Sequence, residues 1–208
     1  MFFGLKSSTI KPMSDKTNPV LVFVRGMPGS GKSYLADTLV NSLGKDKVVL
    51  LDPDHIDLTS QEYVDFSKSL SKEGLDEKIH PFRWLRTTAY GGITAHKIII
   101  WNQPFTIVDI FKRLVTHLQD YATEHQIELP VLLVEVEVDP ALAKTRVNQR
   151  KQNGGHGPSE RTLDNRIADY KSYDNEGYKV VKVDGNGDIS KSATDIIKVL
   201  DELRCSKA

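Results

Sequence analysis

The sequence has only one cysteine, no net charge and no long apolar run, and each of these features argues against a class of protein. With Cys205 alone, the 208-residue chain can form no disulfide within itself, which favours a reducing compartment such as the cytoplasm. Its 28 Lys and Arg balance 28 Asp and Glu, whereas a protein that holds nucleic acid over its whole surface usually carries a basic excess. The longest apolar runs, Ile98–Trp101 and Val131–Val134, are strand-sized, so no membrane span is expected.

One α/β domain is expected over residues 20–208, after a polar, flexible leader at residues 1–19. Buried strands are predicted at Val20–Val24, Val48–Leu51, Ile98–Ile100, Val131–Val138 and Lys179–Val183. Amphipathic or capped segments predict helices at 32–43, after Thr59 and Glu62 (a capping box), and at 82–97, 106–125, 141–151, 159–171 and 192–203. Asp139 is the predicted N-cap of the helix at 141–151, and Ser159 caps the one that follows it. Strands that alternate with helices in this way predict a parallel sheet with helices on both faces.

A glycine-rich segment after the first strand matches the phosphate-loop pattern G-x-x-x-x-G-K-[ST] at every required position. Its glycines let successive backbone N–H groups point at phosphate oxygens, and the following helix presents its positive end to the same anion. Lys32 supplies a cation for the β and γ phosphates, and the Ser33 hydroxyl is placed to bind Mg²⁺. The segment therefore predicts nucleotide-phosphate binding by Gly26, Met27, Pro28, Gly29, Ser30, Gly31, Lys32 and Ser33.

Two carboxylates follow the second predicted strand, at the edge of the sheet where α/β proteins bind ligands. Asp52 and Asp54 flank Pro53, which stiffens the turn between them. A carboxylate here can bind Mg²⁺ or take a proton from an attacking hydroxyl. We expect Asp52 to be the metal ligand and Asp54, which lies further beyond the strand, to be the base. The exchange of these two roles, and a plain turn or N-cap function, stay open as alternatives.

Residues 144–171 form a basic segment, with seven Lys or Arg against three Asp or Glu. Arginines can match the charge that phosphoryl transfer spreads over the phosphate oxygens, so a lid that closes over the nucleotide is expected here. A pair of solvated amphipathic helices is the alternative. The candidate residues are Arg146, Arg150, Arg161 and Arg166 on two helices, and His156 in the glycine loop between them.

An acceptor-binding insertion is expected at about residues 57–97. Within it, Arg83 and Arg86 lie three residues apart beside Trp84, which suits a phosphate or a stacked ring. The alternative is a helix that turns Phe82 and Leu85 inward and leaves both arginines in solvent.

Taken together, these motifs resemble the zeta-toxin-like P-loop kinases. The resemblance rests on the phosphate loop, Leu51-Asp52-Pro53-Asp54, Arg146 with Arg150, and the Gly154-Gly155-His156-x-Pro158 loop before a second arginine helix. It implies a five-stranded parallel sheet in the order 2-3-1-4-5, ATP with Mg²⁺ as the donor, and transfer of the γ-phosphoryl to a hydroxyl. It also implies Asp54 as base, Arg150 with Arg161 or Arg166 as lid arginines, Arg146 near the adenine, and a protein antitoxin or inhibitor as a partner.

The sequence departs from that family in two places that bear on the acceptor. Zeta toxins phosphorylate a UDP-linked amino sugar and carry an arginine soon after the base, where this chain has His55-Ile56-Asp57-Leu58. After the third strand Asn102 stands where an acidic residue is usual; an amide can hold water around Mg²⁺ but adds no charge. A small-molecule kinase acting on a nucleotide-sugar, nucleoside or sugar is the favoured hypothesis. A polynucleotide-end kinase and a regulatory NTPase without kinase activity are the alternatives.

Overall fold

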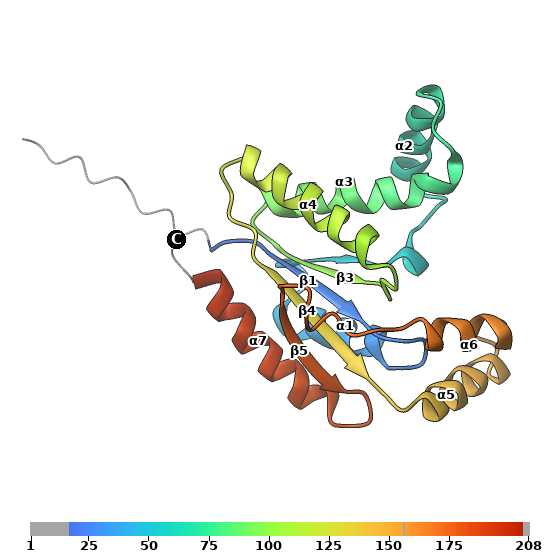
Figure 1. The fold of residues 1–208 in the computed structure, drawn as a ribbon. Helices are drawn as coiled ribbons and strands as arrows, with labels where there is room; N and C mark the ends of the chain where they lie inside the picture. Colours follow the sequence, from blue (N-terminus) through green and yellow to red (C-terminus); the bar gives the residue numbers. More distant parts are fainter. Residues whose placement is uncertain (1–16, 156, 206–208) are drawn as a thin grey trace, which may run out of the picture.

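The computed structural model describes residues 17–155 and 157–205, so most of the expected leader and His156 lie outside the described residues. Five parallel strands form one sheet in the order β2-β3-β1-β4-β5 (Figure 1). This order confirms the expected topology. The strands are β1 (Val20–Arg25), β2 (Val48–Leu51), β3 (Ile98–Asn102), β4 (Val131–Glu137) and β5 (Lys179–Asp184).

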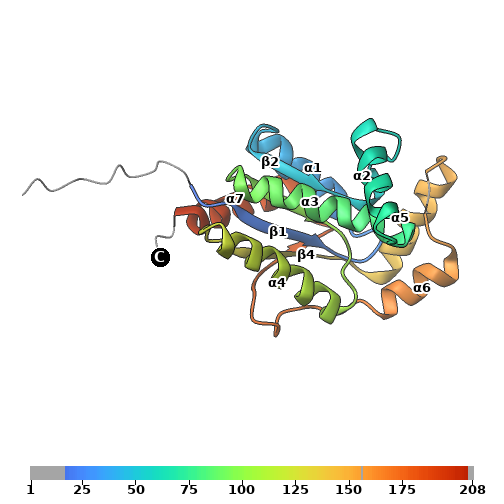
Figure 2. The same ribbon diagram turned by 90° about the horizontal axis from the view of Figure 1, so that it is seen from above.

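Helices cover both faces of the sheet and extend beyond one of its edges (Figures 1 and 2). They are α1 (Lys32–Leu43), α2 (Gln61–Lys72), α3 (His80–Thr94), α4 (Val108–Glu124), α5 (Pro140–Gln152), α6 (Glu160–Ala168) and α7 (Ile189–Cys205). Short 3-10 turns stand at η1 (Pro53–His55) and η2 (Glu77–Ile79). In the described part of the chain, no helix combines the length and the apolar content needed to cross a bilayer.

Strand β1 is the centre of the sheet, and all six of its residues are buried. It pairs with β3 on one side and with β4 on the other. Val20, Val22 and Val24 pack in the core beneath α1 and α7, whereas Leu21 and Phe23 pack in the core beneath α3 and α4. A strand covered on both faces is apolar on both of them, which explains why the run Val20–Val24 is continuous rather than alternating.

Helix starts test the capping predictions directly. Asp139 accepts hydrogen bonds from two backbone amides of α5, and Ser159 accepts one from α6, so both predicted N-caps are confirmed. The predicted capping box at Thr59 is wrong. Asp57 Oδ1 accepts hydrogen bonds from both the backbone N and the hydroxyl of Thr59, so Ser60 is the residue that caps α2.

The last helix begins earlier than the apolar pattern indicates. Asp188 Oδ1 accepts hydrogen bonds from the backbone N atoms of Ser190 and Lys191, and α7 therefore starts at Ile189 rather than near Ser192. A carboxylate that satisfies the free amides of a first turn fixes a helix start more strongly than the position of the first apolar residue.

The segment expected to be an insertion has two parts with different roles in the fold. Helix α3 lies on the sheet, where Leu85, Ala89 and Ile93 are buried in the core. Helix α2 projects beyond the layer of α3 and α4 (Figure 1) and contacts α3 through the rings of Tyr63 and Phe66 on Trp84. Only the α2 arm thus stands apart from the sheet, and its use in acceptor binding stays a prediction.

A buried ion pair joins the end of β1 to β4. Arg25 and Glu135 are opposite one another in the strand register, both are fully buried, and the guanidinium Nη1 contacts the carboxylate Oε1. Two backbone carbonyls accept further hydrogen bonds from Arg25 Nη2, that of Phe105 at 3.1 Å and that of Lys171 at 2.9 Å. Because burial of a charge is costly unless it is fully paired, this many partners is what makes the arrangement stable.

The Arg25–Glu135 pair also collects the segment that follows α6. Glu135 accepts a hydrogen bond from the Ser172 hydroxyl at 2.6 Å and one from the Tyr173 backbone N at 2.8 Å. The Tyr173 ring lies 3.5 Å from the Arg25 guanidinium carbon, and its hydroxyl donates to the Phe105 carbonyl. The β1 end, the β3–α4 loop and the α6–β5 connection are therefore fixed to one another.

Replacement of one member of this pair tests its contribution to stability. Arg25→Met should lower the free energy of unfolding by about 3–5 kcal/mol, because it leaves the Glu135 carboxylate buried without a counter-charge. The double variant Arg25→Met with Glu135→Met should lose much less, since no buried charge remains. Urea unfolding measures both, and equal losses in the single and double variants would contradict this account.

Candidate functional site

The phosphate loop joins the buried end of β1 to the first turn of α1, and its backbone depends on two glycines. Gly29 has φ +84° and Gly31 has φ +97°, a conformation that side-chain-bearing residues rarely adopt. At Gly29 a Cβ atom would also lie 2.4 Å from the Ala143 carbonyl oxygen of α5. The loop therefore has the shape that presents consecutive backbone N–H groups to an anion, with the N-terminus of α1 directly behind it.

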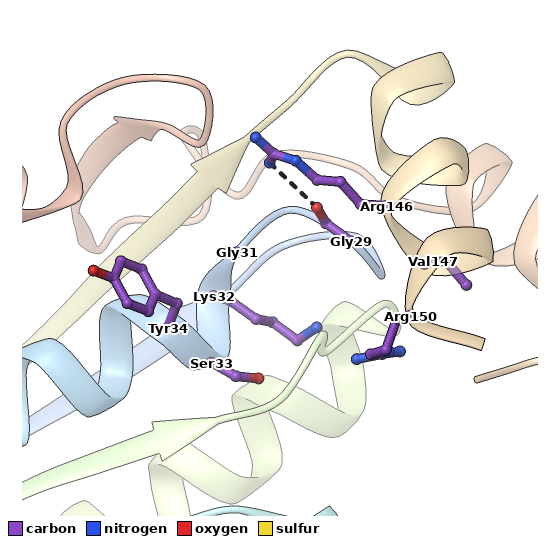
Figure 3. Close-up of a pocket in the computed structure, with 8 residues that line it drawn as sticks. All are labelled: Gly29, Gly31, Lys32, Ser33, Tyr34, Arg146, Val147 and Arg150. Carbon is purple, nitrogen blue, oxygen red and sulfur yellow. Dashed lines mark hydrogen bonds between the residues drawn. The ribbon is translucent and has the colours of Figure 1, made fainter. Parts of the chain in front are cut away.

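A cavity of about 230 Å³, here named the phosphate cavity, opens on this loop. Figure 3 shows Lys32 and Arg150 extending into the same space from α1 and α5, while Tyr34 turns away. The cavity brings together four of the eight predicted phosphate-binding residues and two of the predicted lid arginines. Its lining consists of Gly29, Gly31, Lys32, Ser33, Tyr34, Arg146, Val147 and Arg150.

The charges around Lys32 indicate what this cavity favours. Burial lowers the pKa of Lys32, the carboxylates of Asp54 and Asp52 oppose that shift, and the cations of Arg150 and Arg166 add to it. Each named group therefore lies close enough to act on the ammonium group. A bound polyanion would relieve the repulsion among these three cations. A nucleotide's phosphates require an electrostatic setting of this kind.

Beside the phosphate loop, a hydrogen-bonded set of three side chains lies at the carboxyl edge of the sheet. The amide nitrogen of Asn102 donates to Asp52 Oδ2 at 2.6 Å and to the Ser33 hydroxyl at 3.1 Å. Asp52 Oδ1 accepts from the backbone N of Asp54 at 2.9 Å and so shapes the η1 turn. The structure thus brings together Ser33 from the first turn of α1, Asp52 from the end of β2 and Asn102 from the end of β3.

This set fits a hard cation such as Mg²⁺. The Asn102 Oδ1 atom is buried and accepts no hydrogen bond from the described residues, so one oxygen at the centre of the set lacks a partner. Within the described ranges, no three His, Cys, Asp or Glu residues are placed to hold a metal by themselves. The residues present therefore suit an ion that keeps water and phosphate oxygens among its ligands, as Mg²⁺ usually does.

The two helices of the predicted lid, α5 and α6, hold their arginines in different places. Arg146 Nη1 donates to the Gly185 carbonyl at 3.0 Å and, more weakly, to the Gly29 carbonyl at 3.5 Å, so α5 is tied to the phosphate loop (Figure 3). Arg150 lines the phosphate cavity, and Arg166 of α6 acts on Lys32 through its charge. Arg161 is exposed on α6 and has no described interaction with Lys32. The catalytic roles given to these arginines stay predictions.

The structure does not bring Arg83 and Arg86 to the cavity at Asp52. That cavity, of about 290 Å³, is lined on the α3 side by Trp84, Leu85 and Thr88. At about 3.6 residues per turn, Arg83 and Arg86 point to the opposite side of the helix. Their proposed use in acceptor binding, and that of His156 in the undescribed position, stay predictions.

The shape of the site also depends on three residues that were not predicted from sequence and do not line the phosphate cavity: Arg25, Glu135 and Tyr173. A signal was present, because both strands are apolar until charges appear toward their carboxyl ends: Arg25 is the last residue of VLVFVR, and Glu135 is the first of two glutamates in VLLVEVE. Only the register of β1 on β4 shows that the two charges meet.

Comparison with known proteins places the chain in a family. The model of a family described as "AAA domain" matches residues 21–172, from β1 through both lid helices. The chain belongs to this AAA domain family. The matched region holds the phosphate loop, the Ser33–Asp52–Asn102 set and the arginines of α5 and α6, whereas Tyr173 and Gly185 lie beyond it. No curated protein matches significantly.

Solved structures share the fold of this AAA domain at low sequence identity. A Chloroflexus aurantiacus protein, classed as a kinase by inference, has 18% identity and a TM-score of 0.64, with 89% of this chain and 98% of that chain covered. A Sinorhizobium meliloti gluconokinase has 14% identity and a TM-score of 0.52, with 91% and 94% covered. Mycobacterium tuberculosis APS kinase, solved with AMPPNP and APS, has 14% identity and a TM-score of 0.55, with 89% and 98% covered. These likenesses show a P-loop NTPase-like fold.

Tyr170, whose ring packs against the Arg25 guanidinium, predicts that the protein loses stability in alkali. Burial raises the pKa of Tyr170 well above its ordinary 10.0, and the hydroxyl has no hydrogen-bond partner among the described residues. Its contribution to stability is therefore complete below about pH 10 and is lost as pH rises further, because only the unfolded chain ionises. The free energy of unfolding of Tyr170→Phe, taken relative to that of wild type, should therefore be about 1 kcal/mol higher at about pH 11 than at about pH 8.

Unfolding in urea at the two pH values measures this difference. Tyr34→Phe, at a tyrosine that is 63% exposed, is the control and should follow the wild-type pH dependence. If Tyr170→Phe follows it too, the buried hydroxyl is not the group that destabilises the protein in alkali.

Proposed function

We propose that this protein is an ATP-dependent phosphotransferase that moves the γ-phosphoryl of ATP to a hydroxyl of a small molecule. The observation that carries the proposal is the charge arrangement at Lys32, where Arg150 and Arg166 add positive charge and the Asp54 carboxylate lies close by. Cations stabilise the charge that spreads over a phosphoryl group in transfer, and a nearby carboxylate can take the proton of the attacking hydroxyl. A nucleotide switch needs the first arrangement but not the second.

The reaction would proceed by direct transfer. The acceptor oxygen forms a bond to the γ-phosphorus, the bond from that phosphorus to the β–γ bridging oxygen breaks, and ADP leaves with the electron pair. Asp54, which is exposed at the η1 turn, takes the hydroxyl proton. Lys32 and Arg150 bind the phosphate oxygens from two sides, and Arg146 holds α5 against the phosphate loop.

Mg²⁺ is the cofactor that the site suits. Ser33, Asp52 and Asn102 are the residues that would hold the ion or its water ligands. When bound, it would neutralise charge on the β and γ phosphates. The hydrogen bonds among these residues keep their oxygens together before any ligand arrives, so little reorganisation is needed.

The named activities of similar structures favour a small acceptor. One is a gluconokinase, another a sugar kinase from Janibacter, and a third an APS kinase. A nucleotide-sugar, nucleoside or sugar is therefore proposed as the acceptor class. The zeta-toxin-like subtype, the cytoplasmic location and a protein antitoxin or inhibitor stay predictions. The polynucleotide-end kinase is disfavoured because the acidic stretch at residues 57–65 follows directly on the candidate base.

Lys32→Ala tests the phosphate site. The substitution should weaken ATP binding sharply, because it removes the cation that contacts the β and γ phosphates. Calorimetric titration with ATP and Mg²⁺ measures the affinity. Lys45→Ala, at an exposed lysine of the α1–β2 connection, should leave it unchanged. Unchanged ATP affinity in Lys32→Ala would remove the basis of the proposal.

Asp54→Asn tests the base. It should leave ATP binding near normal and lower phosphotransfer on the order of 10²-fold or more, because an amide cannot accept the hydroxyl proton. Asp37→Asn, at an exposed position on α1, is the control. If transfer survives while Mg²⁺ affinity falls, Asp54 is a metal ligand and Asp52 becomes the candidate base.

The acceptor itself can be found with γ-labelled ATP. The wild-type protein is incubated with nucleosides, sugars, UDP-sugars and oligonucleotides, and the labelled product identifies the class. Label released only as free phosphate would favour a regulatory NTPase instead.

A further inference from the structure

A second cavity of about 230 Å³, here named the loop cavity, lies beside the phosphate site. One wall consists of residues 103–107 of the β3–α4 loop with Ile110 of α4, and the other is formed by Arg166 of the lid. The loop starts against the central strand, because the Gln103 backbone N donates to the Val24 carbonyl at 3.2 Å. The loop cavity thus opens at the same edge of the sheet as the phosphate loop.

Arg166 connects the two cavities. It lines the loop cavity, and its charge also acts on Lys32 in the phosphate cavity. A molecule in the loop cavity therefore contacts Arg166, whose charge reaches Lys32 of the phosphate cavity. This position is the one that an acceptor hydroxyl must reach for transfer.

Contacts within the protein hold the β3–α4 wall of the loop cavity in place before any ligand binds. Phe105 has φ +46°, an unfavourable conformation for a residue with a large side chain. Its carbonyl accepts hydrogen bonds from Arg25 and from the Tyr173 hydroxyl, and its ring packs edge-on against Phe23. Strained backbone that the surroundings hold this firmly is found most often at binding and active sites.

The lining of the loop cavity is largely apolar and open to solvent. Ile107 is 56% exposed and Ile110 is 48% exposed, although both have large apolar side chains. The polar contribution of the loop comes from Thr106 and from Gln103, whose Oε1 already accepts from the Trp101 indole N–H at 3.0 Å, which leaves its amide nitrogen as a donor. A ligand that covers both isoleucines would remove apolar surface from water, which a bare polyol cannot do as well.

We propose that the loop cavity binds the acceptor, and that the acceptor is an alcohol carrying an apolar ring rather than a free sugar. Its hydroxyl lies toward Arg166 and the phosphate site, and its ring covers Ile107 and Ile110. This inference rests on the proposed phosphotransfer for the fate of the hydroxyl, but the binding of the ring does not depend on transfer.

The cavity at Asp52 is the competing location. It is lined by the carboxylates of Asp52 and Asp57 together with Trp84 and Thr88. Both Asp52 oxygens already accept hydrogen bonds, from Asp54 and Asn102, and no side chain of the lid reaches this cavity. Replacement of Thr88 can test this cavity without disturbing the fold, because the Thr88 hydroxyl donates to the Trp84 carbonyl of its own helix.

A matched pair of probes tests the ring preference. Phenyl β-glucoside and methyl β-glucoside carry the same sugar hydroxyls and differ only in the apolar group. Calorimetry on the full chain with Mg²⁺ and AMPPNP should show phenyl β-glucoside binding about tenfold tighter or more. Equal affinities, or no binding of either probe, would overturn the proposal.

Three variants locate the site. Ile110→Ser should abolish the preference for the phenyl probe while AMPPNP affinity stays unchanged. Leu58→Ser, at a leucine that is 53% exposed and outside the loop cavity, should retain it. If Thr88→Ala rather than Ile110→Ser removes the preference, the acceptor site is the cavity at Asp52 and the proposal is wrong. If ring binding depends on Ile110 but incubation with ATP and Mg²⁺ in place of AMPPNP gives no phosphorylated product from the probes or from the acceptor panel, phosphotransfer is refuted and the ligand site stands.

Discussion

The Arg25–Glu135 pair is the constraint on which the geometry of the carboxyl edge depends. Arg25 is the last residue of the central strand, so the phosphate loop starts from a point that cannot move without breaking a buried charge pair. The same two side chains bind the β3–α4 loop and the segment after the lid. The phosphate cavity and the loop cavity therefore share one support, even though no residue of the pair lines either of them.

The neutral total of the chain conceals an uneven distribution. Lys32, Arg150 and Arg166 concentrate positive charge at one edge of the sheet, and burial of the lysine makes that concentration unfavourable without a partner. Asp52 and Asp54 offset part of it from the other side. The site is thus polarised, with cations on α1, α5 and α6 and carboxylates on the β2 side, and this separation suits the proposed reaction, which needs both a bound polyanion and a proton acceptor.

Much of the fold could be predicted from sequence because its causes are local. Continuous apolar runs marked the strands, and Asp139 and Ser159 marked helix starts through contacts within a few residues. The predictions failed where two local signals competed: at α2, Asp57 engages Thr59 and leaves Ser60 as the cap. They could not reach features that depend on register or on helix rotation. The meeting of Arg25 with Glu135, and the turning of Arg83 away from Asp52, follow only from how the elements pack.

The amide at Asn102 has a thermodynamic consequence for the order of binding. A metal site built on the Asp52 carboxylate and the neutral groups of Ser33 and Asn102 would bind a divalent ion only weakly until phosphate oxygens joined its ligands. Under the proposed function, the ion and the nucleotide would then enter together, each raising the affinity of the other by the same factor. The apparent affinity for nucleotide would follow the free Mg²⁺ concentration around the protein, with no resident ion to buffer it.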